Sequence, residues 1–210
     1  MADWVTISSL ATAGGTLVLA VATFSSVRSA NRSARVAERS LLFGQRPLLV
    51  PSREDDLTER VAFGDAVMLN VPGHGGAYLV ANGNVYMAIA LRNGGNGLAV
   101  LQGWRAEPRE RTDSRCPPLD EFHAQSRDLY IPAGYTGFWQ GAIRDRDDPF
   151  YDRVRSAVEN RQRLMVDVLY GDLEGGQRTI ARFSITDWDD VEGERAEVLR
   201  YWEVDRSDPR

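Results

Sequence analysis

The fold class is decided by residues 85–106, which read VYMAIALRNGGNGLAVLQGWRA. Two apolar runs, Val85 to Arg92 and Leu98 to Ala106, flank the glycine-rich segment from Asn93 to Gly97. Runs of this length bounded by glycine and asparagine are typical of β-strands that are joined by a turn. We therefore expect the second run to be the partner strand of the first, with glycines at positions that need a positive φ.

The chain continues in the same pattern on both sides of this stretch. Asp172 to Gly176 has the composition of a hairpin loop, and the segment after Val191 fits either a short helix or a final strand. One helix is expected over 149–161, because Asp148 resembles an N-cap followed by a first-turn proline. We expect a mainly β fold, an antiparallel, immunoglobulin-like β-sandwich with this one short helix inserted. The remaining expected strands are 48–50, 67–71, 129–132, 137–143, 164–170 and 178–186.

The N-terminal segment has a different character, because residues 4–27 carry no charge. A helix of this length spans about 36 Å, more than the roughly 30 Å of a bilayer's hydrocarbon core. We therefore predict a transmembrane helix. A signal peptide is the first alternative, but it would carry positive charge before the apolar stretch, where this chain has Asp3. A buried soluble helix is the second, and it would need a larger core than the rest of the chain offers.

The charges after this segment predict its orientation. Five arginines follow it closely and Glu38 is the one acid among them, so the N-terminus is expected outside and the C-terminal domain in the cytoplasm. Arg46-Pro47 should end the helix, since proline disfavours helix in the residue before it. The predicted domains are a transmembrane and juxtamembrane helix over 1–46 and a β-sandwich over 47–210.

Two faces of the expected helix are candidate contact surfaces. Arginines recur at intervals of 4, 3 and 4, which places them in one stripe, where each contributes about 1 kcal/mol to binding anionic lipid headgroups. Small residues recur on another face and predict helix self-association; the alternative is that these turns dock on the protein's own domain. The membrane-contact residues are Arg28, Arg32, Arg35 and Arg39, and the self-association residues are Ala11, Gly15, Ala20, Val27, Ala30, Ala34, Ala37 and Leu41.

The composition excludes several kinds of chemistry. All 25 basic residues are arginine, so the chain has no lysine for a Schiff base or a phosphate loop. The net charge of -5 argues against a nucleic-acid partner. The two histidines, His74 and His123, lack metal-ligand spacing and are expected to be ordinary surface residues, and the single Cys116 is expected to be a reduced bystander thiol. We predict no catalytic residue, no cofactor and no metal site.

Two further patterns have a functional and a structural interpretation. Acidic clusters could bind a divalent cation, although helix capping or loop solvation explains them better. Aromatic residues could line a groove, although aromatics on alternating strand positions favour core packing. The acids are Asp145, Asp147 and Asp148, and separately Asp187, Asp189 and Asp190; the aromatics are Trp104, Phe138, Trp139, Tyr170, Trp188 and Trp202.

The order of these motifs resembles a large group of uncharacterised, single-pass membrane-anchored β-sandwich proteins of high-GC Gram-positive (actinobacterial) bacteria. The exclusive use of arginine agrees with a GC-rich genome. The resemblance covers nearly the whole chain and implies the architecture, with no catalytic residue to carry over. Its motifs are the uncharged span, the arginine- and alanine-rich helix, Arg46 to Val50, Leu91 to Ala99, Arg127 to Gly134, Tyr170 to Asp172, Tyr201-Trp202 and Asp205 to Arg210.

We expect a membrane-anchored, non-enzymatic interaction or scaffold module with a cytoplasmic β-sandwich. Its partners would be the bilayer's anionic headgroups, an unknown protein and, through the helix, further copies of itself. The first alternative is an extracytoplasmic sandwich that binds a saccharide. The second is a metal-dependent enzyme that uses the acidic clusters.

Overall fold

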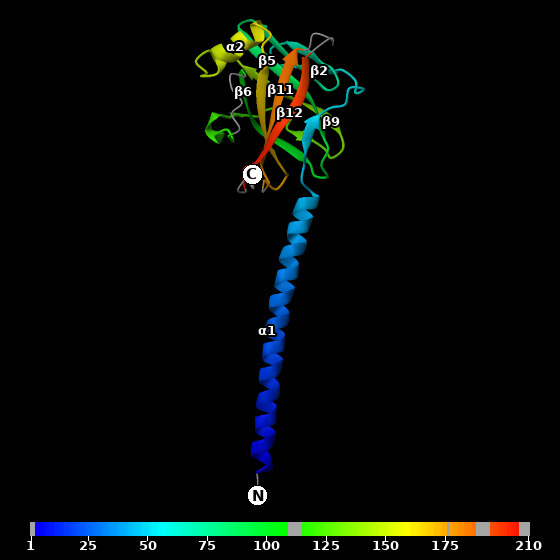
Figure 1. Ribbon diagram of the computed structural model, residues 1–210, viewed down its shortest axis with the longest axis vertical. Helices are drawn as coiled ribbons and strands as arrows, with labels where there is room; N and C mark the ends of the chain where they lie inside the picture. Colours follow the sequence, from blue (N-terminus) through cyan, green and yellow to red (C-terminus); the bar gives the residue numbers. More distant parts are fainter. Residues whose placement is uncertain (1–2, 109–114, 176, 188–193, 206–210) are drawn as a thin grey trace. The chain divides into compact units, whose positions relative to one another are not determined.

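The computed structural model describes residues 3–108, 115–175, 177–187 and 194–205, without the side chains of 4–11 and 187. The chain divides into two compact units, Met1–Gly44 and Gln45–Arg210. The first consists of a helix, and the second contains all the described strands, a short α-helix and a 3₁₀-helix (Leu119–Glu121) (Figure 1).

Helix α1 (Trp4–Gly44) runs without interruption and ends ahead of Arg46-Pro47, where the sequence predicts that helix stops. All the described side chains from Thr12 to Leu41 are exposed. Within the part of the chain that the structure describes, no helix is both long enough and apolar enough to cross a membrane. The uncharged stretch itself begins at Trp4, before the described side chains.

The second unit is built on a ten-stranded antiparallel sheet with the order β1-β5-β4-β12-β11-β10-β6-β7. Strand β9 pairs with β5, β8 pairs with β6, and β2 and β3 form a separate two-stranded sheet. The predicted mainly β, antiparallel class is confirmed. The strands are β1 (Leu49–Pro51), β2 (Glu59–Ala62), β3 (Met68–Val71), β4 (Gly75–Ala81), β5 (Asn84–Asn93), β6 (Ala99–Pro108), β7 (His123–Ala124), β8 (Tyr130–Ile131), β9 (Thr136–Ile143), β10 (Leu164–Gly171), β11 (Thr179–Asp187) and β12 (Glu194–Glu203).

Strand β5 is buried on both faces, which explains its continuous apolar sequence. Its odd-numbered side chains from Val85 to Leu91 enter the main core together with residues of β6, β9, β10 and β11. Its even-numbered side chains from Tyr86 to Ala90 enter a second core, which is covered by Val61, Leu69 and Val71 of the β2–β3 sheet and by Phe63 of the loop between these strands. One strand therefore holds the two cores together.

Several local predictions agree with the structure. The short helix α2 (Tyr151–Glu159) lies within the predicted 149–161. The predicted cap is wrong, because the N-cap residue is Phe150 and no described side chain caps the helix; the Asp148 carboxylate instead accepts a hydrogen bond from the Phe150 N–H (2.8 Å) in the preceding turn. Strands β10 and β11 form the hairpin predicted around Asp172 to Gly176. The ambiguous segment after Val191 is a strand where it is described, β12.

The hairpin between β4 and β5 was not predicted. Strand β4 begins at Gly75-Gly76, where the glycine-rich sequence from Pro72 predicts a turn, and it continues through residues with no predicted element before it turns into β5 through Asn82-Gly83. Both turn residues have a positive φ, 53° for Asn82 and 77° for Gly83. This is the combination that two-residue hairpin turns require.

The predicted pairing of Val85–Arg92 with Leu98–Ala106 is wrong. Strand β5 pairs with β1, β4 and β9, whereas β6 pairs with β10, β7 and β8, so the segment between them crosses from one part of the sheet to another. The positive-φ explanation of the glycines is also wrong, because the described glycines with positive φ lie elsewhere, at 83, 134 and 175. The glycines are instead needed for close approach. A Cβ on Gly95 would overlap the Arg46 carbonyl oxygen, and one on Gly97 the Gln45 carbonyl oxygen.

Asn93 ties this crossing to the segment that enters the unit. Its Oδ1 accepts hydrogen bonds from the N–H of Leu48 (3.1 Å) and of Gly95 (3.0 Å). Its Nδ2 donates to the carbonyl oxygens of Gly97 (2.7 Å) and Ile131 (2.9 Å). The side chain is fully buried, so all four bonds are shielded from water.

The entering segment is held from the other side as well. Arg46 forms an ion pair with Glu203 of β12 and donates a hydrogen bond to the Thr179 hydroxyl of β11 (3.1 Å). The Tyr201 hydroxyl donates to the Leu49 carbonyl oxygen (2.7 Å). The first residues after α1 are therefore fixed on the β unit by β1, β5, β11 and β12.

Candidate functional site

The predicted membrane-contact arginines all lie on α1. Arg28, Arg32, Arg35 and Arg39 are exposed and, because α1 is continuous, their spacing places them along one face. Among the described residues, none of the four takes part in an ion pair or a side-chain hydrogen bond. The described self-association residues are exposed too, and the side chain of Ala11 lies outside the described residues.

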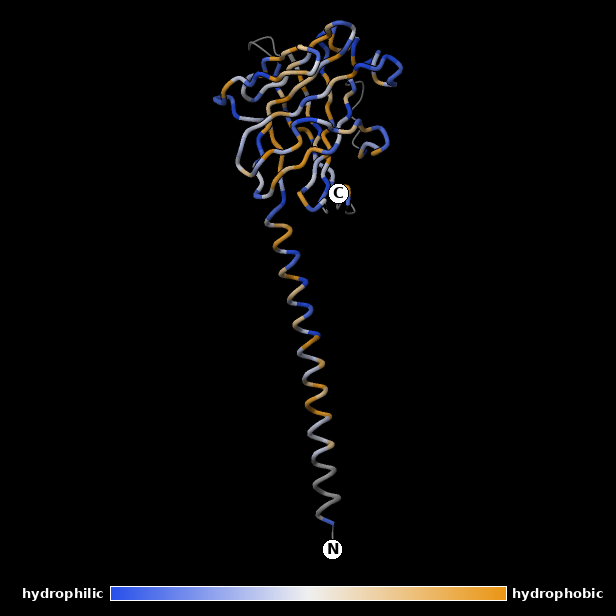
Figure 2. Tube along the Cα trace, turned by 180° about the vertical axis from the view of Figure 1, so that it is seen from behind, coloured by the Kyte–Doolittle hydropathy of each residue, from blue (hydrophilic) through white to orange (hydrophobic). Residues whose placement is uncertain are grey.

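The part of α1 just before these arginines exposes large apolar side chains. Leu17, Val18, Leu19, Val21 and Phe24 are each between 63% and 69% exposed. Consecutive helical residues point about 100° apart, so these residues together with Val27, which is 53% exposed, are spread around the whole circumference of the helix. In Figure 2 the hydrophobic colour covers successive turns in the middle of α1, and hydrophilic turns alternate with it towards Gly44.

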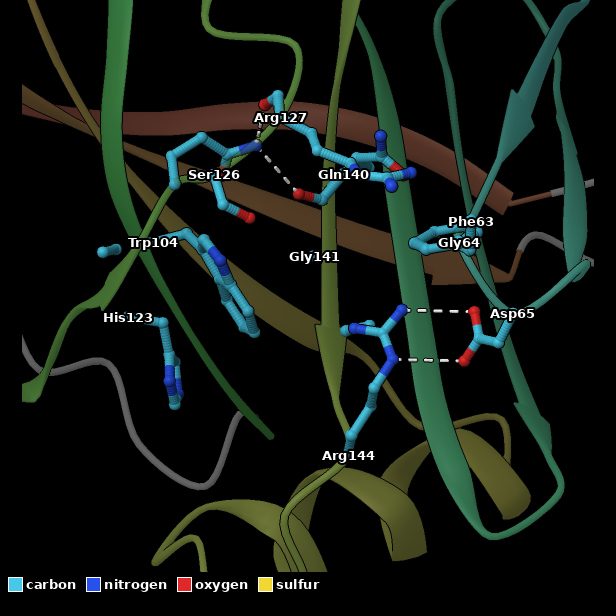
Figure 3. Close-up of a pocket in the computed structure, with 13 residues that line it drawn as sticks. Phe63, Gly64, Asp65, Trp104, His123, Ser126, Arg127, Gln140, Gly141 and Arg144 are labelled. Atoms are coloured by element: carbon cyan, nitrogen blue, oxygen red, sulfur yellow. Dashed lines mark hydrogen bonds and ion pairs between the residues drawn. The ribbon is translucent and has the colours of Figure 1, made fainter.

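The β unit contains a pocket of about 700 Å³ that the sequence analysis did not predict. It lies between two strand edges, because β7 is the last strand of the sheet order and, among the described strands, β9 pairs with β5 alone. We call it the seam pocket (Figure 3). It is lined by Phe63 to Asp65 from the β2–β3 loop, Trp104 from β6, His123 to Arg127 from β7 and the residues after it, Gln140 to Ala142 from β9, and Arg144.

One wall of the seam pocket is an ion pair. The Arg144 Nε and Nη2 atoms lie 3.1 and 3.2 Å from the two carboxylate oxygens of Asp65, and Figure 3 shows the two groups facing each other. The Tyr86 hydroxyl also donates to Asp65 and accepts from the Asn84 amide (3.1 Å). The hydrogen bonds from Arg144 and then Tyr86 lower the pKa of Asp65 to about 2, so this carboxylate stays ionised.

The opposite wall is aromatic. The His123 ring lies 4.5 Å from the Trp104 ring at 32°, and its Nε2 lies 3.2 Å from the Asp148 carboxylate. Trp104 in turn packs edge-on against Trp139, with 5.5 Å between ring centroids. Gly141 leaves room for this packing, since a Cβ there would lie 2.6 Å from the Trp139 ring.

The floor of the seam pocket is the free edge of β9. The Tyr135 carbonyl oxygen accepts a hydrogen bond from the Asn93 N–H. In this register the backbone N–H and C=O groups of the odd-numbered β9 residues therefore point towards β5, and those of the even-numbered residues point away from it. In agreement, the Gln140 carbonyl oxygen accepts a hydrogen bond from the Gln125 side chain across the pocket (3.2 Å). The Gln140 amide donates to Asp128, and within the described residues the Oε1 atoms of Gln125 and Gln140 are buried without a hydrogen-bond partner.

The other candidates from the sequence have structural roles where they are described. Asp148 accepts from the Phe150 N–H (2.8 Å) in the turn before α2, and Asp145 accepts from the Asp147 N–H (3.0 Å). His74 is half-buried and binds Ser52 through its backbone N–H (2.9 Å). Within the described part of the chain, no three His, Cys, Asp or Glu side chains gather as a metal site would require. The acids at 189 and 190, the side chain of 187 and the tryptophan at 188 lie outside the described residues.

The aromatic residues that the sequence singled out are mainly core residues where they are described. Four of the five described are nearly or fully buried, and Trp104 lines the seam pocket as well as the core. They are Trp104, Trp139, Tyr170 and Trp202. Cys116 is exposed.

The sequence reasoning missed Gln125, Arg127, Gln140 and Arg144. These residues belong to separate segments of the chain, and no periodic pattern in the sequence indicates that the segments lie together. One signal was available for β9, since its alternation identified a strand, but the sequence pattern does not show which of its edges remains open. No protein-family model, curated protein or solved structure matches the chain.

Proposed function

We propose that this protein is a membrane-attached, non-enzymatic interaction module, in which α1 provides the attachment and a cytoplasmic β unit binds a protein partner. The observation that carries the proposal is the surface of α1. Its apolar side chains from Leu17 to Val27 are exposed around the whole helix, and four arginines without ion-pair partners among the described residues follow directly. A lipid bilayer with anionic headgroups would cover the apolar side chains and bind the arginines.

The proposal concerns the whole uncharged stretch from Trp4 to Val27, which includes the side chains of 4–11 that the structure does not describe. The arginines on its C-terminal side favour a cytoplasmic β unit. The small-residue face of α1 would further allow copies of the helix to associate in the bilayer. These statements rest on sequence and exposure together.

We also infer that the ten-stranded sheet bends back on itself as a β-sandwich. Supporting this, one core cluster contains residues of β5 and β9 as well as residues of β6, β10 and β11. Two packed faces of a sheet with a shared core are what a sandwich requires. The immunoglobulin-like strand arrangement stays a prediction.

Flotation of the full chain with lipid vesicles tests the attachment. The full chain should float with vesicles that contain phosphatidylglycerol and should stay bound in high salt, because burial of apolar area is insensitive to screening. The double variant Leu19→Glu/Val21→Glu should remain in the dense fraction. The matched control Leu57→Glu/Leu173→Glu, which replaces two exposed leucines of the β unit, should float like the wild type.

The arginine stripe has its own readout in the same assay. Replacing Arg28, Arg32, Arg35 and Arg39 by glutamine should remove the preference for anionic over neutral vesicles. If the wild-type chain remains in the dense fraction with every vesicle composition, the membrane attachment is refuted.

A further inference from the structure

We propose that the free edge of β9 in the seam pocket binds an extended acidic segment of a partner protein, which adds beside β9 as a new strand. This inference rests on the proposed function in one respect, namely that the β unit binds a protein partner. It goes further by naming the site, the mode of binding and the chemistry of the partner.

The first argument is the unpaired backbone of β9. The N–H and C=O groups of Gln140 and Ala142 point away from β5 and into the seam pocket, by the register described above. Apart from the bond from Gln125 to the Gln140 carbonyl, no described group pairs with them. Gln140 is only 7% exposed, and buried backbone groups nearly always have a partner. Alternating donors and acceptors at strand spacing are complementary to another strand.

The second argument is the matching edge on the other side of the pocket. The Gln125 N–H donates to the Gln102 carbonyl oxygen of β6 (2.9 Å), so the backbone groups of Ala124 face away from β6 and towards the pocket. Strands β7 and β9 are not hydrogen-bonded to each other, and a glutamine side chain crosses between them. The two edges therefore lie farther apart than the about 4.8 Å between paired strands. The pocket volume of about 700 Å³ occupies this gap.

The third argument is charge. The described residues that line the seam pocket include two arginines, Arg127 and Arg144, and one carboxylate, Asp65. Arg144 is neutralised by Asp65, whereas Arg127 is exposed and has no ion pair among the described residues. Residues 48–210 hold 20 arginines and 28 acids, a formal charge of -8. An excess of positive charge in the pocket of such an acidic unit selects a segment that carries carboxylates.

Fluorescently labelled hexapeptides test the site on the full chain in detergent micelles. The probes are an alternating Val-Glu peptide, an alternating Val-Lys peptide, and the Val-Glu peptide with N-methyl groups on alternate residues. The Val-Glu peptide should bind at least about tenfold more tightly than the Val-Lys peptide, a difference that one charge-assisted hydrogen bond supports. The N-methylated peptide should not bind, because it lacks the donors that pair with an edge strand.

Two variants locate the binding on the structure. Arg127→Glu should weaken Val-Glu binding at least about tenfold, whereas Arg60→Glu, an exposed arginine that does not line the pocket, should change it less than twofold. Ala142→Pro should abolish binding, because it removes an N–H that faces the pocket and takes no part in pairing with β5. Retained circular dichroism establishes that this variant is folded, and Arg127→Glu tests the site independently of it.

The outcomes separate this inference from the proposed function. Equal binding of the N-methylated peptide would refute strand addition, and competition by free glutamate at equal carboxylate concentration would identify a simple anion pocket instead. If no peptide binds while the chain still floats with vesicles, the peptide site is refuted and the membrane attachment stands.

Discussion

Replacing Asn93 by alanine should lower the free energy of unfolding of the β unit more than almost any other single change to a polar residue. The side chain is fully buried and makes four hydrogen bonds, two as acceptor and two as donor. Each is worth about 1 kcal/mol net, and alanine leaves the Leu48 N–H and the Ile131 carbonyl without this partner. We expect a loss of about 3–5 kcal/mol in the free energy of unfolding, a large share of the roughly 5–15 kcal/mol typical of a domain.

Urea unfolding of the full chain, followed by tryptophan fluorescence, measures this loss because Trp104, Trp139 and Trp202 are buried in the β unit. Two glycine variants in the same segment form a matched pair. Gly94→Ala should be nearly neutral, since its Cβ would come no closer than 3.8 Å to any atom beyond its two chain neighbours. Gly97→Ala should be strongly destabilising, since its Cβ would overlap the Gln45 carbonyl oxygen.

The reasoning is refuted by either of two results. A loss below about 1 kcal/mol for Asn93→Ala would mean that its four bonds contribute little against water. Equal stability of Gly94→Ala and Gly97→Ala would mean that close approach of the entering segment is not what requires glycine here.

Three further outcomes follow from the β unit. The pKa of Asp65 is lowered to about 2 from 3.8, so its ion pair with Arg144 stabilises the fold above about pH 4 and is lost as the pH falls towards 2. With side chains 31% and 49% exposed, screening reduces this to about 1 kcal/mol, and Asp65→Asn should flatten the dependence of urea stability on pH between 2 and 5. Arg182→Met should cost about 3–5 kcal/mol in urea unfolding by leaving Asp167, 1% exposed, without its main partner, and Asp167→Leu in the same chain should restore most of it. Gly141→Ala should lower the thermal midpoint by several degrees through its contact with the tryptophan rings, and an unchanged midpoint would contradict the packing.

The sequence predicts those parts of the fold that depend on neighbouring residues. The end of α1 before Pro47, helix α2 shortly after Pro149 and the hairpin around Asp172 each follow from proline geometry or turn composition. The turn at Asn82-Gly83 belongs to the same group, because Asn-Gly is a strong hairpin signal that the sequence analysis overlooked.

The pairing of strands is less accessible from a single sequence. The order of β5 and β6 along the chain suggests a hairpin, yet β5 pairs with β4, β1 and β9, and β6 pairs with β10, β7 and β8. Burial of β5 on both faces needs β2–β3 on one side and the main core on the other. The glycines between β5 and β6 are needed because the backbone of Gln45 and Arg46, which is distant in sequence, packs closely against them. No pattern within the segment reports such a contact.

The seam pocket lies beyond sequence reasoning for a related reason. It exists because β7 and β9 each have a partner on one side and lack a described strand on the other. That depends on the closure of the whole sheet, whereas Arg127 and Gln140 look like ordinary polar residues in the sequence.

The most direct test of the central claim is the location of the C-terminus in cells that express the full chain. A reporter that works only in the cytoplasm and a second that works only after export are each fused behind Arg210. We predict that the cytoplasmic reporter is active, that the exported one is silent, and that the fusion stays with the membrane fraction after an alkaline wash. An active exported reporter, or release of the fusion by the wash, would contradict the proposal of a membrane-attached module with a cytoplasmic β unit.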